Sequence, residues 1–145
     1  MNIRPIQTGD LEYVRQNPYQ ESVKDMPNIP MPINAFACEH DDEVIGIGGI
    51  NILYPGVGEA WLMLTKHANK ETIFGFRKFC KIRETMDAII AENGLWRVEA
   101  QARVDSLESI RLIKVLGFEQ ICVRKKYCPD KTDMVLFEKL IDEPV

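Results

Sequence analysis

Basic side chains gather in one short stretch of an otherwise acidic chain. Lys66, Lys70, Arg77 and Lys78 follow one another closely, whereas the whole sequence carries a net charge of -4 and has a pI near 5.2. Such a cluster can hold a small phosphate-bearing ligand through charge-assisted hydrogen bonds, although Glu71 works against it. A solvated helix face has the same composition, so both interpretations stay open. The acidic balance argues against binding to bulk nucleic acid.

Two other patterns do not indicate a site. Cys38, His40 and the acidic residues beside them lie on one predicted turn, where neighbouring side chains diverge and no tetrahedral ligand spacing is present. The glycines of segment 46–56 suggest a dinucleotide fingerprint, but the segment continues as a strand and the third glycine is missing.

The cysteines form no C-x-x-C pair, so we expect reduced thiols. A covalent mechanism through Cys122 or Cys128 lacks a neighbouring base in the sequence.

The length and composition predict one globular domain spanning residues 1–145. The sequence has 145 residues, 46% hydrophobic and 28% charged, close to the averages of compact proteins, and no linker or composition shift divides it. Its start lacks an apolar leader and no apolar run has the length of a membrane span. We therefore expect a cytoplasmic protein without a membrane partner. The sequence leaves open whether the chain is a monomer or a homodimer.

Hydrophobic periodicity places these residues on an ordered series of elements. The long helix joins the strands at 59–65 and 96–104, which predicts that these two run parallel at the centre of the sheet. Its predicted apolar side carries Ile73, Phe76, Phe79 or Cys80, Met86, and Ile89 or Ile90. The predicted series is a strand at 2–6, a helix at 11–16, a proline-rich connection over 18–34 with a helix-compatible piece at 20–26, strands at 35–39, 44–54 and 59–65, a long helix ending at Asn93, a strand at 96–104, a helix at 107–117, and a hairpin of strands at 120–127 and 134–140. This order predicts an α/β fold.

The segment 105–118, DSLESIRLIKVLGF, has the clearest helix start and stop in the chain. Asp105 or Ser106 is the predicted N-cap, whose side-chain oxygen accepts a backbone N–H of the first turn. Gly117 supplies the left-handed residue that ends such a helix, and Phe118 then packs back. A capped amphipathic helix is also compatible with packing alone, so the other segments must decide whether it belongs to a site.

This segment resembles the last strand–helix unit of the GNAT acyltransferase superfamily. Its Ser-Ile-Arg form is most similar to the branch that acetylates N-terminal amines of ribosomal proteins, and Ser106 stands where that family usually has Asn. The matching positions are Ser109, Ile110, Arg111, Leu112, Gly117 and Phe118. The element order is similar to the GNAT fold over essentially the whole chain. The resemblance implies a mixed, mostly antiparallel sheet of six or seven strands, helices on both faces, and a splay between the central parallel strands that receives an acyl-coenzyme A.

The resemblance also implies where acetyl-coenzyme A binds. The family holds the pyrophosphate on an Arg/Gln-x-x-Gly-x-Gly/Ala loop before the long helix, and only Lys70 and Gly75 of the aligned residues 70–75 fit that pattern. Ile73 stands where the backbone normally approaches the phosphate, so its side chain is expected to crowd the ligand. The implied cofactor-binding residues are Met63, Leu64, Thr65, Lys70, Gly75, Arg77, Lys78, Ser106 and Ser109.

Three catalytic candidates follow from the same resemblance. Glu59 starts the strand on which family members often place the carboxylate that deprotonates the acceptor amine. Ile113 replaces the Tyr that many members use as the acid, which leaves Ser109 and Tyr127 as hydroxyls for the departing thiol. The implied activity is direct transfer of acetyl to an amine, either a small molecule or a protein N-terminus. The incomplete phosphate loop also resembles the GNAT-like proteins of bacteriophages, which implies a non-catalytic structural, interaction or coenzyme A-binding role as the alternative.

Overall fold

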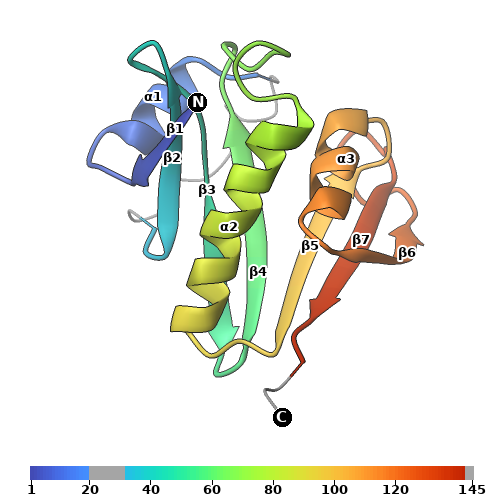
Figure 1. Ribbon diagram of the computed structural model, residues 1–145. Coiled ribbons are helices and arrows are strands. Elements are labelled where there is room, and N and C mark those ends of the chain that lie inside the picture. Colours follow the sequence, from blue (N-terminus) through green and yellow to red (C-terminus); the bar gives the residue numbers. More distant parts are fainter. Residues whose placement is uncertain (20–31, 143–145) are drawn as a thin grey trace.

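Seven strands and three helices make up the part of the chain that the structure describes (Figure 1). The structure is a computed structural model and describes residues 1–19 and 32–142. The predicted helix-compatible piece at 20–26 lies outside these residues. The elements are β1 Asn2–Pro5, α1 Asp10–Gln16, β2 Ala35–His40, β3 Glu43–Tyr54, β4 Val57–Leu64, α2 Phe76–Glu92, β5 Arg97–Arg103, α3 Leu107–Val115, β6 Glu119–Arg124 and β7 Met134–Leu140.

The strands of the described residues form one sheet in the order β1-β2-β3-β4-β5-β7-β6. Every neighbouring pair is antiparallel except β4 and β5, which run parallel and are joined through α2. The prediction of an α/β fold with a mixed, mostly antiparallel sheet and a parallel central pair is therefore confirmed.

Helices cover both faces of this sheet, as predicted. In β2, Ala37 packs with Val14 of α1, whereas its neighbours Phe36 and Cys38 belong to the larger core under α2 and α3. Successive residues of a strand point to opposite faces, so α1 lies on one face and the other two helices lie on the opposite face. Figure 1 shows α2 and α3 side by side in front of the sheet.

The buried face of α2 differs from its prediction at the first turn. Phe79, Ile82, Met86 and Ile90 are buried and recur at three- and four-residue spacing. Phe76, which was predicted to lie on this face, is 72% exposed. The loop before the helix brings Ile73 into the larger core, where it is almost fully buried. Ile73 therefore covers this part of the core in place of Phe76.

The glycine-rich stretch lies inside β3, as its continuation as a strand predicts. A Cβ atom on Gly49 would lie 2.4 Å from the carbonyl oxygen of Asn34, so no side chain fits there beside the start of β2. The predicted acidic turn joins β2 to β3 through Asp41 and Asp42, both at positive φ, which suits the right-handed twist of a two-residue hairpin. Gly49 and the turn at Asp41 and Asp42 therefore have structural roles, because they allow β2 and β3 to pair closely.

Two strand boundaries differ from their predictions by more than one residue. β4 begins at Val57, before the predicted start at Glu59. β6 ends at Arg124 instead of Tyr127, because Lys126 has a φ of 55° and its N–H donates to the Asp133 carboxylate at 2.9 Å. A left-handed residue cannot continue the pleated ladder. The hairpin of β6 and β7 is otherwise antiparallel, as predicted.

Helix α3 ends as predicted but begins differently. Gly117 has a φ of 94° and Phe118 is buried, which confirms the left-handed stop. Ser106 occupies the N-cap position, yet no side chain makes a capping hydrogen bond there. The carboxylate of Asp105, the other predicted cap, accepts instead from Arg103 at 3.2 Å. The predicted capping bond is therefore wrong, because an ion pair with the preceding strand competes for the acid.

The cysteines of the described residues are free thiols, as expected. Burial raises the pKa of Cys38 to about 12, so this thiol stays protonated at neutral pH. Across residues 1–19 and 32–142, no group of His, Cys, Asp and Glu side chains is placed to hold a metal ion. Within the same ranges, no helix has the length and apolar character needed to cross a membrane.

An ion pair ties β1 to the start of α1. Arg4 donates to both oxygens of the Asp10 carboxylate at 2.8 and 2.9 Å, and the backbone N–H of Gln7 adds a third bond at 2.7 Å. Only 6% of Asp10 is exposed. The hydrogen bonds from Arg4 lower the pKa of this carboxyl, because they outweigh the opposing effect of burial.

We expect Asp10→Asn to lower the free energy of unfolding by about 2 kcal/mol at pH 7, because the charge-assisted bonds lose their acceptor charge. The pKa of Asp10 in the folded state lies below its unfolded value of about 3.9. The carboxylate therefore stabilises the fold above that pH, and this contribution is lost as the pH falls through the folded pKa. Urea unfolding at pH 7 and near pH 2 should show the difference between the two proteins shrinking.

The exposed Asp42 provides the matched control. Asp42→Asn should change the free energy of unfolding by less than about 0.5 kcal/mol at either pH. A destabilisation by Asp10→Asn that stayed constant over this pH range would contradict the role given to the carboxylate charge.

Candidate functional site

The parallel pair at the centre of the sheet separates part of the way along. β4 and β5 pair only as far as Glu59 and Glu99, although both strands continue beyond this point. The Thr65 N–H donates to the Ile45 carbonyl of β3 at 2.9 Å, so odd-numbered residues direct their backbone groups toward β3 and even-numbered residues of β4 direct theirs toward β5. Among the described residues, no strand of the sheet pairs with the N–H and C=O of Leu62 on the side that faces the gap. The splay expected between these strands is present.

A cavity of about 100 Å³ opens in this splay. Alanine residues on both strands leave the space, and apolar side chains of α2 and α3 close one side of it. It is lined by Ala60, Trp61, Leu62, Ile82, Met86, Ala100, Gln101, Ala102, Ser109, Leu112, Ile113 and Leu116. A narrow apolar space beside an open backbone edge suits a thin chain that carries amide groups and a small apolar end.

Ser109 is the hydroxyl in the lining of this cavity. The hydroxyl of Ser106, at the N-cap of α3, donates to Ser109 Oγ at 2.8 Å. Ser109 then accepts one hydrogen bond and keeps its own proton for a donor bond, since a hydroxyl both donates and accepts. The two serines that the sequence singled out therefore lie together, with Ser109 able to donate to an atom in the cavity.

Glu59 lies where the two strands part. It is half-buried and points to the α1 side of the sheet, because it alternates in the same way as Met63. Within the described residues its carboxylate has no hydrogen-bond or ion-pair partner. By contrast, Glu99 opposite it accepts from Arg97 at 3.0 Å, and Arg97 also pairs with Glu138. Glu59 is thus an unpaired carboxylate at the mouth of the splay.

Met63, Leu64 and Thr65, predicted to contact the cofactor, lie beyond the cavity along β4. Thr65 is fully buried, and its hydroxyl donates to the Val44 carbonyl at 2.8 Å and accepts from the His67 N–H at 3.3 Å. This side chain holds the end of β4 against β3. Met63 packs in the core under α1. The structure does not bring these three side chains to the cavity.

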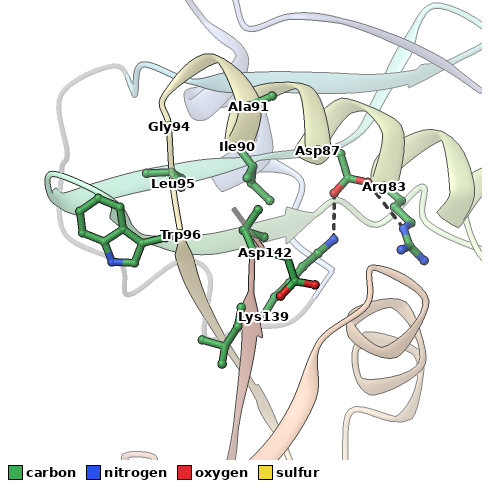
Figure 2. A pocket seen from close by; sticks show the side chains of 11 residues that line it. Arg83, Asp87, Ile90, Ala91, Gly94, Leu95, Trp96, Lys139 and Asp142 are labelled. Atoms are coloured by element: carbon green, nitrogen blue, oxygen red, sulfur yellow. Dashed lines mark hydrogen bonds and ion pairs between the residues drawn. The ribbon is translucent and has the colours of Figure 1, made fainter. Parts of the chain in front are cut away.

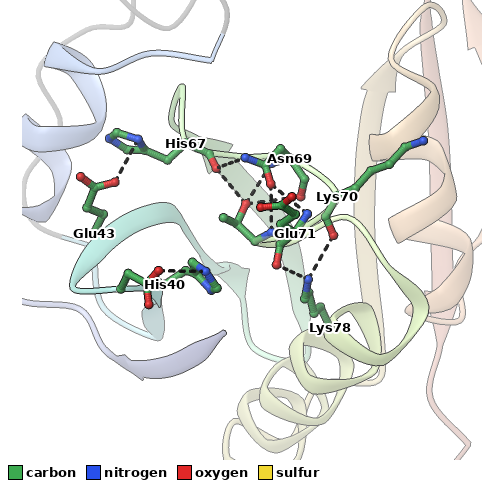
Figure 3. Close-up of polar contacts among 9 residues, drawn as sticks. His40, Glu43, His67, Asn69, Lys70, Glu71 and Lys78 are labelled. Carbon is green, nitrogen blue, oxygen red and sulfur yellow. Dashed lines mark hydrogen bonds and ion pairs between the residues drawn. The ribbon is translucent and has the colours of Figure 1, made fainter.

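The loop between β4 and α2 is held by its own polar groups (Figure 3). The side-chain oxygen of Asn69 accepts from the N–H groups of Glu71 and Thr72 at 2.8 and 3.1 Å. The Thr72 hydroxyl donates to the His67 carbonyl at 2.8 Å and accepts from the Asn69 N–H at 2.9 Å. The Asn69 carbonyl accepts from the N–H groups of residues 72–74. The amides of residues 71–74 are therefore directed into the loop, whereas the resemblance led us to expect amides of this loop to face a phosphate.

Anion-binding groups remain at the start of α2. Its first backbone bond runs from Phe79 N–H to the Gly75 carbonyl, so the N–H groups of residues 76–78 have no helical partner. No acidic residue occupies the first turn, and open space surrounds Gly75. Lys70 and Arg77 are exposed beside it. A helix N-terminus with free amides and nearby cations is suited to a phosphate group.

Two other residues of this region differ from their expected roles. Ile73 is 1% exposed and packs in the core, so its side chain points away from the surface and does not crowd a ligand there. The ammonium group of Lys78 donates to the carbonyls of Lys70 and Glu71 (Figure 3), which ties it to the loop. Lys70, Gly75, Arg77 and Lys78 all belong to this loop or to the first turn of α2. Their role in binding the cofactor stays a prediction.

Tyr127 lies away from the cavity, in the connection after β6. Its half-exposed ring has the guanidinium of Arg124 at 5.0 Å from its centre, and Arg124 donates to Gln101 at 3.1 Å. Gln101 lines the cavity, so the phenol is separated from it by two side chains. Ile113, at the position of the missing Tyr, lines the cavity directly.

Trp61 and Gln101 are lining residues that sequence reasoning did not single out. The indole N–H of Trp61 is buried and has no acceptor among residues 1–19 and 32–142. The strand pattern placed both residues on their strands, but only the point at which pairing stops brings them to one cavity. No local sequence signal marks that point.

Comparisons with known proteins identify the fold. No family model matches the sequence, and no curated protein is similar to it in sequence. Among solved structures, a putative phosphinothricin N-acetyltransferase has a TM-score of 0.74 at 14% identity, with 98% of this chain and 99% of the other covered. The ribosomal-protein-alanine N-acetyltransferase of Brucella melitensis has a TM-score of 0.70 at 14% identity, with 97% and 100% covered.

A third similar structure contains the acyl donor. It is a GNAT family acetyltransferase from Elizabethkingia anophelis with acetyl-CoA bound, with a TM-score of 0.65 at 13% identity and 97% of each chain covered. These likenesses extend over almost the whole chain. The chain has the GNAT fold, as its element order and the segment 105–118 led us to expect.

We expect Thr72→Val to lower the free energy of unfolding by about 2 kcal/mol, because the Asn69 N–H and the His67 C=O lose their bonds to the buried Thr72 hydroxyl. Thr85→Val is the control, since that hydroxyl makes one exposed bond to the Lys81 carbonyl and should matter by less than about 0.5 kcal/mol. Urea unfolding measures both variants. Equal effects would show that the Thr72 hydroxyl does not organise the loop.

Proposed function

We propose that this GNAT-fold chain is an N-acyltransferase that moves an acetyl group from acetyl-coenzyme A to an amine by direct attack. The observation that carries the proposal is the end of the β4–β5 ladder at Glu59, which leaves an open backbone edge beside an apolar cavity that Ser109 lines. The similar structures include a spermidine N-acetyltransferase, a ribosomal-protein-alanine N-acetyltransferase and a putative phosphinothricin N-acetyltransferase, and each of these named acceptors offers an amine. The acceptor of this chain is an amine of the same general class.

The donor site is assigned from the fit of two groups of residues. The open edge at Leu62 offers a donor and an acceptor to the amides of the pantetheine arm, and the cavity admits the small acetyl end. The free amides of residues 76–78, with Lys70 and Arg77, suit the pyrophosphate. The amides of residues 71–74 do not fit this role, because the loop already uses them.

The residues that handle protons lie on opposite faces of the sheet. Glu59, on the α1 side, accepts a proton from the incoming ammonium group, and its lack of an ion-pair partner leaves the carboxylate available. Ser109, on the α3 side, donates a hydrogen bond to the departing thiolate while Ser106 holds its oxygen. The amine and the thiol therefore use different sides of the β4–β5 gap. Arg124 and Gln101 lie between Tyr127 and the cavity, so its phenol is less suited than Ser109 to reach the departing thiolate.

A second candidate function is a non-catalytic GNAT-like protein that binds coenzyme A or a macromolecular partner. The internally bonded loop around Asn69 favours it, because this loop withholds amides that the family uses for phosphate. Both candidates are proposed for a cytoplasmic protein without nucleic-acid or membrane partners, acting as a monomer or homodimer. They differ in turnover, which the following experiments measure.

Calorimetric titration should show acetyl-coenzyme A binding to the chain, and Arg77→Glu should weaken it about tenfold by reversing a charge at the α2 N-terminus. Lys114→Glu reverses an exposed charge in the last turn of α3 and should leave the dissociation constant unchanged within about twofold. The proposal fails if no binding occurs at millimolar donor, or if both variants weaken it equally.

Turnover should be detectable as release of free thiol when amino acids, polyamines and peptides with free N-termini are offered as acceptors. Glu59→Gln should lower kcat/KM by about 100-fold or more with the best acceptor, because the general base is lost, while donor binding stays unchanged. Glu119→Gln on the exposed strand β6 is the control. Donor binding without turnover for every acceptor would favour the non-catalytic candidate and exclude the role given to Glu59.

A further inference from the structure

A second cavity lies at the other end of α2, away from the loop that precedes this helix (Figure 2). It has a volume of about 690 Å³ and lies between the second half of α2, the start of β5 and the end of β7. Small-molecule sites span about 300–1,000 Å³, so this volume is large enough for a ligand. Among the described residues, it shares no lining residue with the cavity in the splay. The two are separate sites.

One wall of this cavity carries two cations around a single carboxylate. Lys139 donates to the Asp87 carboxylate at 2.8 Å and to the Leu116 carbonyl at 2.7 Å. Arg83 donates to the Val115 carbonyl at 2.9 Å, and its Nε lies 3.6 Å from the other oxygen of Asp87. Figure 2 shows Asp87 between the two basic side chains. The wall therefore has a net charge of +1, because two cations surround one carboxylate.

This wall also has unused hydrogen-bond donors. An ammonium group has three protons, and two of those on Lys139 are engaged by described residues. Arg83 uses one of its terminal nitrogens, which leaves the second nitrogen of the guanidinium fork. Only 14% of the Lys139 side chain is exposed, so its charge is partly removed from water and interacts more strongly than a surface charge.

The rest of the cavity is largely apolar. Ile90 and Leu95 are buried side chains that form its base. Trp96 is 54% exposed at the rim, and its ring packs on Gly56, where a Cβ atom would lie 2.1 Å from the ring. That contact holds the indole in position. Figure 2 shows Trp96 and Arg83 at opposite ends of the group of lining residues.

We propose that this cavity binds a small amphipathic anion, a monocarboxylate with an aliphatic or aromatic body. The carboxylate pairs with Arg83 and Lys139, and the apolar body covers Leu95 and extends toward Trp96. Asp142 lines the same cavity and has no ion-pair partner among the described residues. Its exposed carboxylate repels the anionic head and so directs it to the basic wall. The site stands apart from the proposed acyl transfer.

The test uses the whole chain without coenzyme A. The probe is 8-anilinonaphthalene-1-sulfonate, an apolar ring system with one anionic group, and tryptophan emission is followed during its titration. Binding should quench the emission of Trp96, and Trp96→Phe should remove this quenching. Octanoate should displace the probe, whereas octylamine, which has the same apolar body and a cationic head, should not. Saturating coenzyme A should leave the probe bound.

Variants locate the site on the protein. Arg83→Gln should weaken probe binding about tenfold, because one charged partner of the anion is lost. Ala91→Phe should weaken it at least as much, since Ala91 is an exposed α2 residue that lines the cavity and the larger side chain fills it. Arg111→Gln removes the same charge from an exposed position on α3 and should leave the dissociation constant within about twofold. Thermal melting verifies that each variant folds.

Each outcome decides the proposal. Selective loss in Arg83→Gln and Ala91→Phe, with displacement by octanoate alone, supports a site for amphipathic anions. Absence of probe binding, equal loss in Arg83→Gln and Arg111→Gln, displacement by octylamine as effective as by octanoate, or displacement by coenzyme A would each overturn it. None of these results depends on whether acetyl transfer occurs.

Discussion

Parallel pairing between β4 and β5 stops at Glu59 and Glu99, although both strands continue. A backbone edge inside a sheet is normally paired, because an unpaired N–H or C=O out of water is costly. Here the edge at Leu62 borders a cavity, where a ligand can supply the missing bonds. The same separation places Glu59 at the mouth of the gap. Ser109 of α3 lines the cavity in this gap from the opposite face of the sheet. The candidate chemistry depends on this single interruption.

The loop before α2 shows how a fold can be retained while its local ligand contacts change. Asn69 and Thr72 bind the amides of the loop, so these groups are satisfied without phosphate. The free amides at the start of α2 and the nearby Lys70 and Arg77 are still available. Anion binding here would therefore rest on the helix terminus and on charge more than on the loop backbone. The bonded loop amides favour a non-catalytic binder, whereas the free amides at the start of α2 are still compatible with an enzyme that binds the donor.

Helix α2 borders both the cavity in the splay and the cavity at its C-terminal half. Ile82 and Met86 line the splay, whereas Arg83 and Asp87, one position further along, line the second cavity. Adjacent residues of a helix point about 100° apart, so one helix presents different chemistry on two sides. Lys139 reaches the carbonyl of Leu116, whose side chain lines the splay. The two cavities are thus separate in their lining yet share a rigid wall.

Local patterns in the sequence determined most of the elements and their order. Alternation marked β5 through Val98, Ala100 and Ala102, and Gly117 with its positive φ ended α3, because these features act over a few residues. The element order was sufficient to anticipate an α/β fold, and its resemblance to the GNAT order, together with the segment 105–118, led us to expect the GNAT fold. The basic residues near α2 were also gathered by sequence proximity alone. Ser106 and Ser109 met because they lie one helical turn apart.

Only the tertiary structure decided what these residues can do. Thr65 became a buried structural hydroxyl and Ile73 turned into the core, each because of contacts with distant segments whose placement no local pattern specifies. Lys78 binds carbonyls of the preceding loop, which depends on how that loop folds back on the helix. The length of the β4–β5 ladder depends on how two strands and two helices pack together, so no single segment encodes it. The second cavity likewise arises where the end of β7 meets α2, two elements far apart in the chain. The sequence determined the elements, and packing between distant elements determined the sites.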